Sequence, residues 1–377
     1  MEEKEYELGD LLAYEQPTPY IVESTKYSDI YKTPVLTAGK SFIIGHTNET
    51  TGIYENLPVI IFDDFTTSSQ FVNFKFKVKS SAMKILSANT ELVLPKYAYY
   101  RMQIIKFDHS THKRYWIQHY SKLKVQIPPL PVQQQIIEKI EELFSELDKS
   151  VETLKTIKQQ LAVYRQAVLK EAFEGIAEAT ILDSIAVMID PQPSHRTPPE
   201  FVDGIPYIGI GDIDYKEKKP NLADARKVSP EVLQEHLERY TLHDGDFVMG
   251  KIGTIGKPFR ITLPQKYALS ANVILIQPNS EVIVPAFLFW QFSSILVTKQ
   301  LFEGATATSQ PAFGIKKARL LSIKISSIKE QNRIVKEIES RLSVCDSIEH
   351  TVDTVLAQAD AMRQSILKQA FEGGLTE

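Results

Sequence analysis

RQAVLKEAFEG at Arg165–Gly175 and RQSILKQAFEG at Arg363–Gly373 decide how this chain of 377 residues is organised. They close a longer match in which residues 133–175 align without gaps onto residues 331–373, at an offset of 198 residues. Two long helices can resemble each other by composition alone, but an ungapped match that repeats Arg-Gln and Ala-Phe-Glu-Gly goes beyond composition. We interpret the match as an internal duplication.

Each copy is predicted to form one long helix. Apolar residues recur at steps of three and four, which is the pattern of a coiled-coil seam. Polar residues interrupt both seams, Lys158 and Arg165 in the first and Glu349 and Arg363 in the second, which favours a fixed register over maximal stability. The predicted seam positions are Ile140, Phe144, Leu147, Val151, Leu154 and Leu161 in the first copy and Ile338, Leu342, Val352, Leu356 and Ile366 in the second.

The two predicted helices need a partner surface. Neither can bury its apolar stripe alone, so the simplest arrangement packs the two copies together. The long segment between them allows an antiparallel pair, and about 43 residues at ~1.5 Å each give a rod of roughly 65 Å. A coiled coil with no further role is the alternative. Because the helices separate two comparable globular segments, we favour a spacer.

The two globular segments begin and end alike. LGDLL at 8–12 precedes PTP at 17–19, and LDSI at 182–185 precedes PQP at 191–193. Both segments finish in strand-like runs, at 123–127 and 321–325. We therefore predict an α+β chain with pseudo-twofold symmetry, in which two mixed α/β globules with twisted β-sheets alternate with two long antiparallel coiled-coil helices. The expected domains are a first globule at 1–127, a first helical spacer at 128–175, a second globule at 176–327 and a second spacer at 328–377.

Composition limits the possible functions. The net charge of −4 argues mildly against a nucleic-acid partner, but residues 16–127 carry +6, whereas 128–175 and 328–377 carry −2 and −3. One cysteine, Cys345, allows no disulfide framework and no cysteine-based zinc site within one copy. The chain starts with acidic residues instead of a basic leader, and its apolar runs are too short for a bilayer. We expect a cytoplasmic protein.

The loops of the globules carry small, polar and basic residues. Lys75, Lys77 and Lys79 alternate with apolar residues, which predicts three ammonium groups on one strand face that could follow phosphates. An ordinary solvated strand face is the equally weighted alternative. The stretch GKIGTIGK at 250–257 resembles a phosphate-binding loop only superficially, because a proline and a strand-like run follow it; we predict a glycine-rich β-turn.

Two polar loops just before the helices correspond at the offset of 198 residues, and such loops are good candidates for base-edge or phosphate contacts. One ends at Arg114 and the other at Pro311. The candidate DNA-binding residues are Lys40, His46, Asn48, Thr67, Ser68, Lys75, Lys77, Lys79, His112, Lys113 and Arg114 in the first globule, and Lys251, Thr254, Lys257, Thr308, Ser309, Gln310 and Lys316 in the second.

Catalytic sites are disfavoured. His109 and His112 lack a carboxylate or cysteine cluster that would complete a metal site. The pair at 63–64 is predicted to cap a turn, and Asp212 and Asp214 to lie in a charged surface turn. We find no adenine-methylation motif, no cofactor fingerprint and no helicase P-loop. The chain is therefore expected to have no catalytic or metal-binding residues and no enzymatic activity.

The order globule, long helix, globule, long helix resembles the specificity subunits of type I restriction-modification systems. IPPLPVQQQI at 127–136 is similar to the family's Ile-Pro-Pro-Leu-x-x-Gln-x-x-Ile at the start of its helix. The stretches 45–54, 60–66 and 78–84 resemble one class of recognition domain, and 244–248 with 251–253 resemble another. The resemblance covers essentially the whole chain. ISSIKEQ at 325–331 departs from it by lacking the prolines.

This resemblance implies a DNA reader. Each globule would read one half of a split double-stranded target, and the rod would set the gap, with half-sites about one helical turn, roughly 34–36 Å, apart. The helices would dock two methyltransferase subunits, which carry S-adenosylmethionine and flip the target adenine. Restriction subunits would supply ATP- and magnesium-dependent translocation and cleavage. No cofactor is expected in this chain itself, and the acidic helices suit a protein-binding surface.

Two other functions remain open. A coiled-coil adaptor whose globules bind proteins predicts no salt-dependent DNA binding and no effect on methylation. A self-sufficient nuclease or methyltransferase is disfavoured by the missing motifs.

Overall fold

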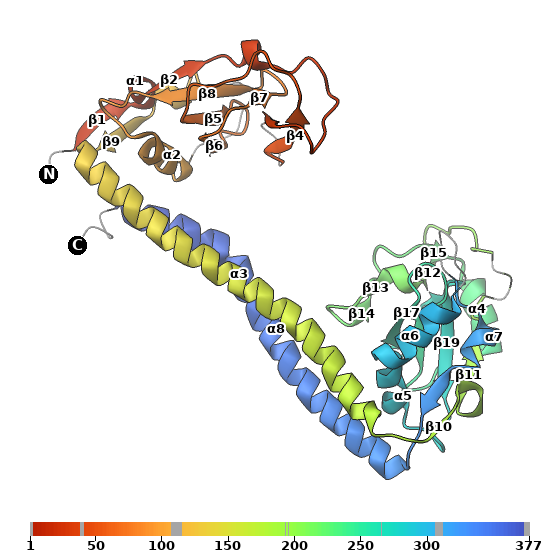
Figure 1. Ribbon diagram of the computed structural model, residues 1–377. Helices are drawn as coiled ribbons and strands as arrows, with labels where there is room; N and C mark the ends of the chain where they lie inside the picture. Colours follow the sequence, from red (N-terminus) through yellow and green to blue (C-terminus); the bar gives the residue numbers. More distant parts are fainter. Residues whose placement is uncertain are drawn as a thin grey trace. The chain divides into compact units, whose positions relative to one another are not determined.

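The computed structural model describes residues 3–37, 41–106, 115–192, 194, 196–264, 266–305 and 312–372. The chain divides into two compact units, Met1–Lys155 with Asp353–Glu377, and Thr156–Val352. Each unit contains one globule and a part of each long helix (Figure 1). None of the described helices is long and apolar enough to cross a membrane.

The two long helices are α3 (Leu130–Glu174) and α8 (Ile328–Phe371). Their first residues are separated by the offset of the sequence duplication, so the prediction of one long helix in each copy is confirmed. Within each unit the two helices run antiparallel. In the first unit Arg363 of α8 contacts Asp148 of α3, and in the second Arg165 of α3 contacts Asp346 of α8. Every predicted seam position is buried or half-buried, as an apolar seam requires.

In the globule of the first unit, the described residues form three small sheets. Their strand orders are β1–β9, β2–β8–β5–β6 and β4–β3–β7. The strands are β1 (Lys4–Glu7), β2 (Leu12–Glu15), β3 (Thr33–Leu36), β4 (Ile43–Thr47), β5 (Val59–Asp63), β6 (Ser69–Val72), β7 (Lys77–Val78), β8 (Met83–Ala88) and β9 (Lys124–Ile127). Two helices, α1 (Leu8–Leu11) and α2 (Pro95–Gln103), and two 3-10 turns, η1 (Thr18–Tyr20) and η2 (Tyr120–Lys122), complete it. β5 is buried along its whole length, which explains its continuous apolar run.

The globule of the second unit repeats this topology. Its strand orders are β10–β20, β11–β19–β16–β17 and β15–β12–β18, with an added hairpin β13–β14. The strands are β10 (Ala179–Ile181), β11 (Ala186–Ile189), β12 (Ile205–Ile208), β13 (Ile213–Asp214), β14 (Lys219–Pro220), β15 (Lys227–Val228), β16 (Phe247–Gly250), β17 (Gly256–Arg260), β18 (Ala268–Leu269), β19 (Val273–Pro278) and β20 (Ser322–Lys324). The helices are α4 (Pro230–Arg239), α5 (Pro285–Phe292), α6 (Ile295–Gly304) and α7 (Ile315–Ala318), and the 3-10 turns are η3 (Leu182–Ser184) and η4 (Ile210–Asp212). The predicted α+β class is confirmed.

One buried glutamine attaches the start of each long helix to its globule. Gln133 accepts a hydrogen bond from Leu94 N at 2.8 Å and donates to the carbonyls of Leu92 and Pro128. Gln331, its equivalent in the duplication, accepts from Val284 N at 2.7 Å and donates to two carbonyls in the same way. The missing prolines before α8 therefore leave the geometry of this helix start intact.

Aromatic contacts attach the end of each long helix. In the first unit Phe371 of α8 packs edge-on against Tyr97 of α2, with 5.2 Å between ring centroids. In the second unit Phe173 of α3 packs edge-on against Phe287 of α5 at 5.4 Å. Each globule is thus held by the start of one long helix and the end of the other.

Candidate nucleic-acid interface

Three chain segments meet at one place in the first globule. The backbone N–H of Asp64, just after β5, donates to Ala82 O at 3.3 Å, just before β8. The N–H of Tyr115 donates to Asp64 O at 2.9 Å. We call this meeting of residues 64–68, 79–82 and 115 the first junction.

The second globule has an equivalent meeting point. The N–H of Lys251, just after β16, donates to Asn272 O at 2.8 Å, just before β19, and the N–H of Phe313 donates to Lys251 O at 2.8 Å. We call the meeting of residues 251–255, 270–272 and 312–313 the second junction. Tyr115 and Phe313 are related by the duplication offset, so the predicted pre-helix loops lead into equivalent places. The loop residues His112, Lys113, Arg114, Thr308, Ser309 and Gln310, and also Lys40, lie outside the described residues.

A buried ion pair lies beneath each junction. In the first globule Lys84 Nζ lies 3.4 Å from Asp64 Oδ2 and donates to Gln16 Oε1 at 3.0 Å. In the second, Lys251 Nζ lies 2.8 Å from Asp190 Oδ2. Such pairs fix loop position more than they add stability, but removing one partner leaves an uncompensated buried charge.

The expectation of three ammonium groups on one strand face is wrong. Only Lys77 and Val78 of this stretch form a strand, and the Lys77 side chain is 4% exposed, because its Nζ pairs with Glu49 Oε2 at 2.8 Å. Burial alone would raise the pKa of Glu49, but hydrogen bonds from Lys77 and from backbone amides hold it below its ordinary value. Lys251 is similarly buried. Lys77 and Lys251 are therefore structural cations and leave the set of proposed DNA contacts.

The remaining candidates of the first globule form two groups. Thr67 and Ser68 lie in the loop of the first junction, and exposed Lys79 follows β7 in the segment that leads to it. His46, Asn48 and Lys75 lie at β4 or before β7, toward the other end of the small sheet, where Lys75 pairs with Glu55. The structure therefore brings together only part of the predicted set. Asp63 caps the β5 turn as predicted, accepting from Phe65 N at 2.9 Å.

The glycine-rich stretch of the second globule forms a short loop between two antiparallel strands and does not open a helix. It joins β16 to β17, and Gly253 and Gly256 both have φ of +75°, a conformation that suits glycine. Exposed Thr254 lies in this loop, and Lys257 follows it, 5.4 Å above the ring of Tyr215. Lys316, on α7, lines a cavity of about 500 Å³ beside Lys251.

A second cavity at this junction, of about 360 Å³, was not predicted from the sequence. Its lining includes Arg226, Ile252 and Asn272. These residues come from three separate segments that only the folded sheet brings together. Asp212, expected in a surface turn, accepts from Gly209 N at 2.7 Å beside this cavity. Among the described residues, no group of histidine, cysteine and acidic side chains could hold a metal ion.

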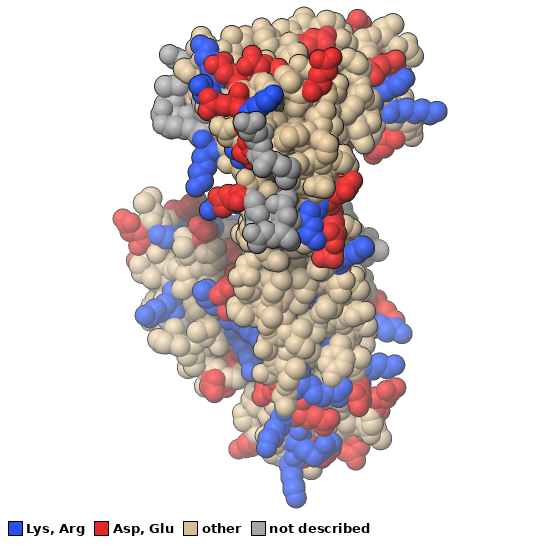
Figure 2. Space-filling model, turned by 90° about the vertical axis from the view of Figure 1, so that its left-hand side faces the viewer, with Lys and Arg blue, Asp and Glu red and all other residues tan. Residues whose placement is uncertain are grey.

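Charged side chains are mixed on the face shown in Figure 2, where lysine and arginine alternate with aspartate and glutamate between wide neutral areas. A DNA contact on such a surface depends on positioned loops more than on a uniform basic field.

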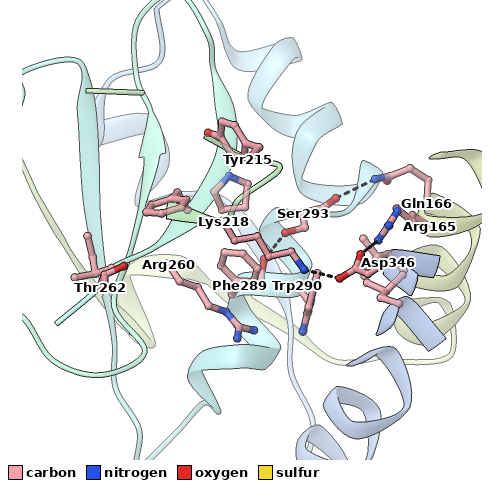
Figure 3. A pocket seen from close by; sticks show the side chains of 15 residues that line it. Arg165, Gln166, Tyr215, Lys218, Arg260, Thr262, Phe289, Trp290, Ser293 and Asp346 are labelled. Atoms are coloured by element: carbon pink, nitrogen blue, oxygen red, sulfur yellow. Dashed lines mark hydrogen bonds and ion pairs between the residues drawn. The ribbon is translucent and has the colours of Figure 1, made fainter. Parts of the chain in front are cut away.

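Within the second unit the globule is also fixed to the helices by side chains around a cavity of about 440 Å³ (Figure 3). Lys218, in the turn of the β13–β14 hairpin, and Arg165 of α3 both point to Asp346 of α8. Gln166 donates to Ser293 O at 3.2 Å. This hairpin, which has no counterpart in the described part of the first globule, thus provides an extra attachment.

Comparisons with known proteins agree on one family. A family model for the type I restriction modification DNA specificity domain matches residues 193–358. The specificity subunit of the type I restriction enzyme EcoR124I/EcoR124II of Escherichia coli is 31% identical over 366 residues, covering 90% of this chain and 87% of that subunit. The EcoBI specificity subunit of Escherichia coli is 27% identical over 277 residues, covering 66% of this chain and 58% of that subunit.

Solved structures share the fold. A chain from a structure on complex assembly and conformational transition of the type I R-M system superposes with a TM-score of 0.69 at 16% identity, covering 99% of this chain and 98% of that one. The HsdS subunit from Thermoanaerobacter tengcongensis superposes with a TM-score of 0.56 at 14% identity, covering 99% and 97%. The sequence relationship to the EcoR124I/EcoR124II subunit, which extends over most of both chains, shows that this chain belongs to the family of type I restriction enzyme specificity subunits.

Proposed function

We propose that this chain reads a two-part double-stranded DNA target, one half with each globule, and takes no part in catalysis. The observation that carries the proposal is the repeated junction. Asp64 and Tyr115 in one globule, and Lys251 and Phe313 in the other, make the same backbone hydrogen bonds at equivalent places. Two equivalent loop clusters in one chain suit two half-sites, since loops on a fixed sheet can present side chains to base edges.

The long helices would serve as a spacer and as a docking surface for methyltransferase subunits, two in number. Their net charges of −2 and −3 disfavour DNA contact. In the second unit, Val163 of α3 is 71% exposed and Val344 of α8 is 58% exposed. A protein partner that covers these helices would bury such side chains, and contiguous patches of them mark surfaces that bind another protein.

The functional division proposed is a first recognition domain at 1–127, helical spacers at 128–175 and 328–377, and a second recognition domain at 176–327. The bounds of α3 and α8 support it. Methyltransferase subunits would bring S-adenosylmethionine, and restriction subunits ATP and magnesium. With chromosomal DNA as its ligand, the chain would act in the cytoplasm.

The test is a binding measurement with the assembled complex. This chain is purified with a type I methyltransferase subunit that assembles with it, and DNA binding is measured at several salt concentrations with a randomised library. The proposal predicts enrichment of a two-part motif, with affinity that falls as salt rises. Binding without any enriched motif, or no DNA binding, would contradict it and support the protein-binding adaptor.

A further inference from the structure

The cavity at the second junction is lined by segments that otherwise lie far apart in the sequence. Arg226 precedes β15, Ile252 lies in the loop between β16 and β17, and Asn272 precedes β19. Asn272 belongs to the junction because its carbonyl accepts the N–H of Lys251. Any DNA half-site that the second globule contacts at this junction therefore meets the cavity.

The floor of the cavity is held in one shape. The hydroxyl of Tyr207 accepts from Ala271 N at 3.0 Å, and the hydroxyl of Ser270 donates to Asn272 Oδ1. A Cβ at Gly209 would lie 2.7 Å from Asn272 Oδ1 and 2.8 Å from Ser270 Oγ, so any larger residue there would displace these two side chains. These contacts fix the Asn272 amide, whose nitrogen has no hydrogen-bond partner in the part of the chain that the structure describes.

Arg226 provides the cationic side of the cavity, whose lining also contains Asp212, a carboxylate that accepts the backbone N–H of Gly209. Arg226 donates from Nη2 to Pro198 O at 3.1 Å, which orients the guanidinium, and it forms no ion pair with the described residues. The other N–H groups of the guanidinium stay available to a ligand. Ile252 is 39% exposed and adds an apolar edge.

This combination favours one kind of ligand. The available groups on Arg226 and Asn272 are hydrogen-bond donors, and the major-groove edge of guanine offers two acceptors, N7 and O6. Arginine binds this edge through two parallel hydrogen bonds, whereas a phosphate contact needs no cavity and no fixed amide.

We infer that Arg226 is a specificity-determining residue that reads a guanine in the half-site of the second globule, with the Asn272 amide at its side. The inference rests on the proposed function, because it requires the second globule to read DNA.

The experiment uses the full chain assembled with its methyltransferase subunit and sequences the methylated products of a randomised library. Arg226→Ala should relax one guanine position in one half of the motif and lower methylation of the original sites by about 10- to 100-fold. The other half of the motif should stay unchanged. Arg226→Lys should not restore the guanine preference, because a lysine lacks the two-pronged geometry.

Arg239→Ala is the matched control. Arg239 is also exposed, and its Nη2 donates to a backbone carbonyl, that of Asp190, at 2.9 Å, but it does not line the cavity. This variant should keep the parental motif. Asn272→Asp provides a second test, since it keeps the acceptor for Ser270 and replaces the unpaired donor with a negative group. It should lower methylation of the original sites while thermal unfolding stays close to that of the parent.

The outcomes separate the two levels of the proposal. If Arg226→Ala weakens all sites equally and the motif is unchanged, Arg226 contacts a phosphate and the inference is wrong, while the proposed function stands. If the parental complex itself methylates no two-part motif, the proposed function fails.

Discussion

Arg165 of α3 and Asp346 of α8 form an ion pair with 2.7 Å between Nη1 and Oδ1, and their equivalents in the duplication, Arg363 and Asp148, form the same pair. Each arginine interrupts the apolar seam of its helix. These two pairs explain how the polar positions fix the register of the helices. An arginine of one helix can meet the aspartate of the other in only one antiparallel register.

Asp346→Asn tests this register contact. Burial alone would raise the pKa of Asp346, but hydrogen bonds from Lys218 and Arg165 hold it below the ordinary value of 3.8. A carboxylate with a lowered pKa stabilises the fold above its ordinary pKa, and this contribution is lost as pH falls through the lowered value. Because both partners are partly exposed, we expect a loss of about 1 kcal/mol at pH 7 that disappears under strongly acidic conditions.

Urea unfolding at several pH values measures this loss. Glu142→Gln, which removes an exposed pair with Lys139 inside α3, is the control and should cost less than about 0.5 kcal/mol. A loss for Asp346→Asn that persists unchanged at low pH would show that charge is not its cause.

Gln133→Ala and Gln331→Ala should each destabilise one unit. Both side chains are fully buried and satisfy backbone groups that would otherwise have no partner. We expect about 3 kcal/mol for each variant, since several buried polar groups lose their hydrogen bonds. Hydrogen exchange identifies the unit affected. Exposed Gln134 is the control, and Gln134→Ala should change little; equal effects for all three variants would refute the anchoring role.

Lys251→Ala and Lys257→Ala should distinguish a lysine that stabilises the fold from a lysine that binds DNA. Removing the buried Lys251 takes away the cation that lies 2.8 Å from Asp190 Oδ2 and should cost about 3–5 kcal/mol of stability. Exposed Lys257 should cost almost none, but its loss should weaken DNA binding evenly across sequences. Thermal unfolding and binding titrations distinguish the two, and unchanged stability of Lys251→Ala would contradict the structural assignment.

Changing Lys113 and Arg114 together to alanine should weaken DNA binding by the assembled complex. If both contact phosphates, the slope of log affinity against log salt should become less steep by about 2. Unaltered affinity at moderate salt would remove this loop from the proposed contacts.

A paired heptad deletion tests the spacer. Removing Leu147–Thr153 together with Gln358–Gln364 takes out Asp148 and its partner Arg363 at once, so the remaining seam stays in register. Each helix becomes shorter by roughly 10 Å. The gap in the recognised motif should shrink by up to about three base pairs, or binding should be lost. An unchanged gap would defeat the spacer role.

The order of globules and long helices could be predicted because apolar heptads and an internal duplication are visible in the sequence itself. The motif around Phe173 and Phe371 and the heptads before it needed no knowledge of tertiary structure. Side-chain exposure in the short strands could not be predicted: Lys77 follows the period-two pattern, yet it is drawn inward by Glu49, which lies 28 residues away in the sequence. The cavity with Arg226 and Asn272 left no sequence signal, because only long-range strand pairing brings its lining together.

The most direct test of DNA reading by this chain is adenine-methylation sequencing in a host that lacks its own adenine methyltransferases. A type I methyltransferase subunit that assembles with this chain is expressed there with and without this chain. Our account predicts methylated adenines in a two-part motif with a fixed unspecified gap, and only when this chain is present. A motif that appears without this chain, or no methylation in its presence, would contradict the account.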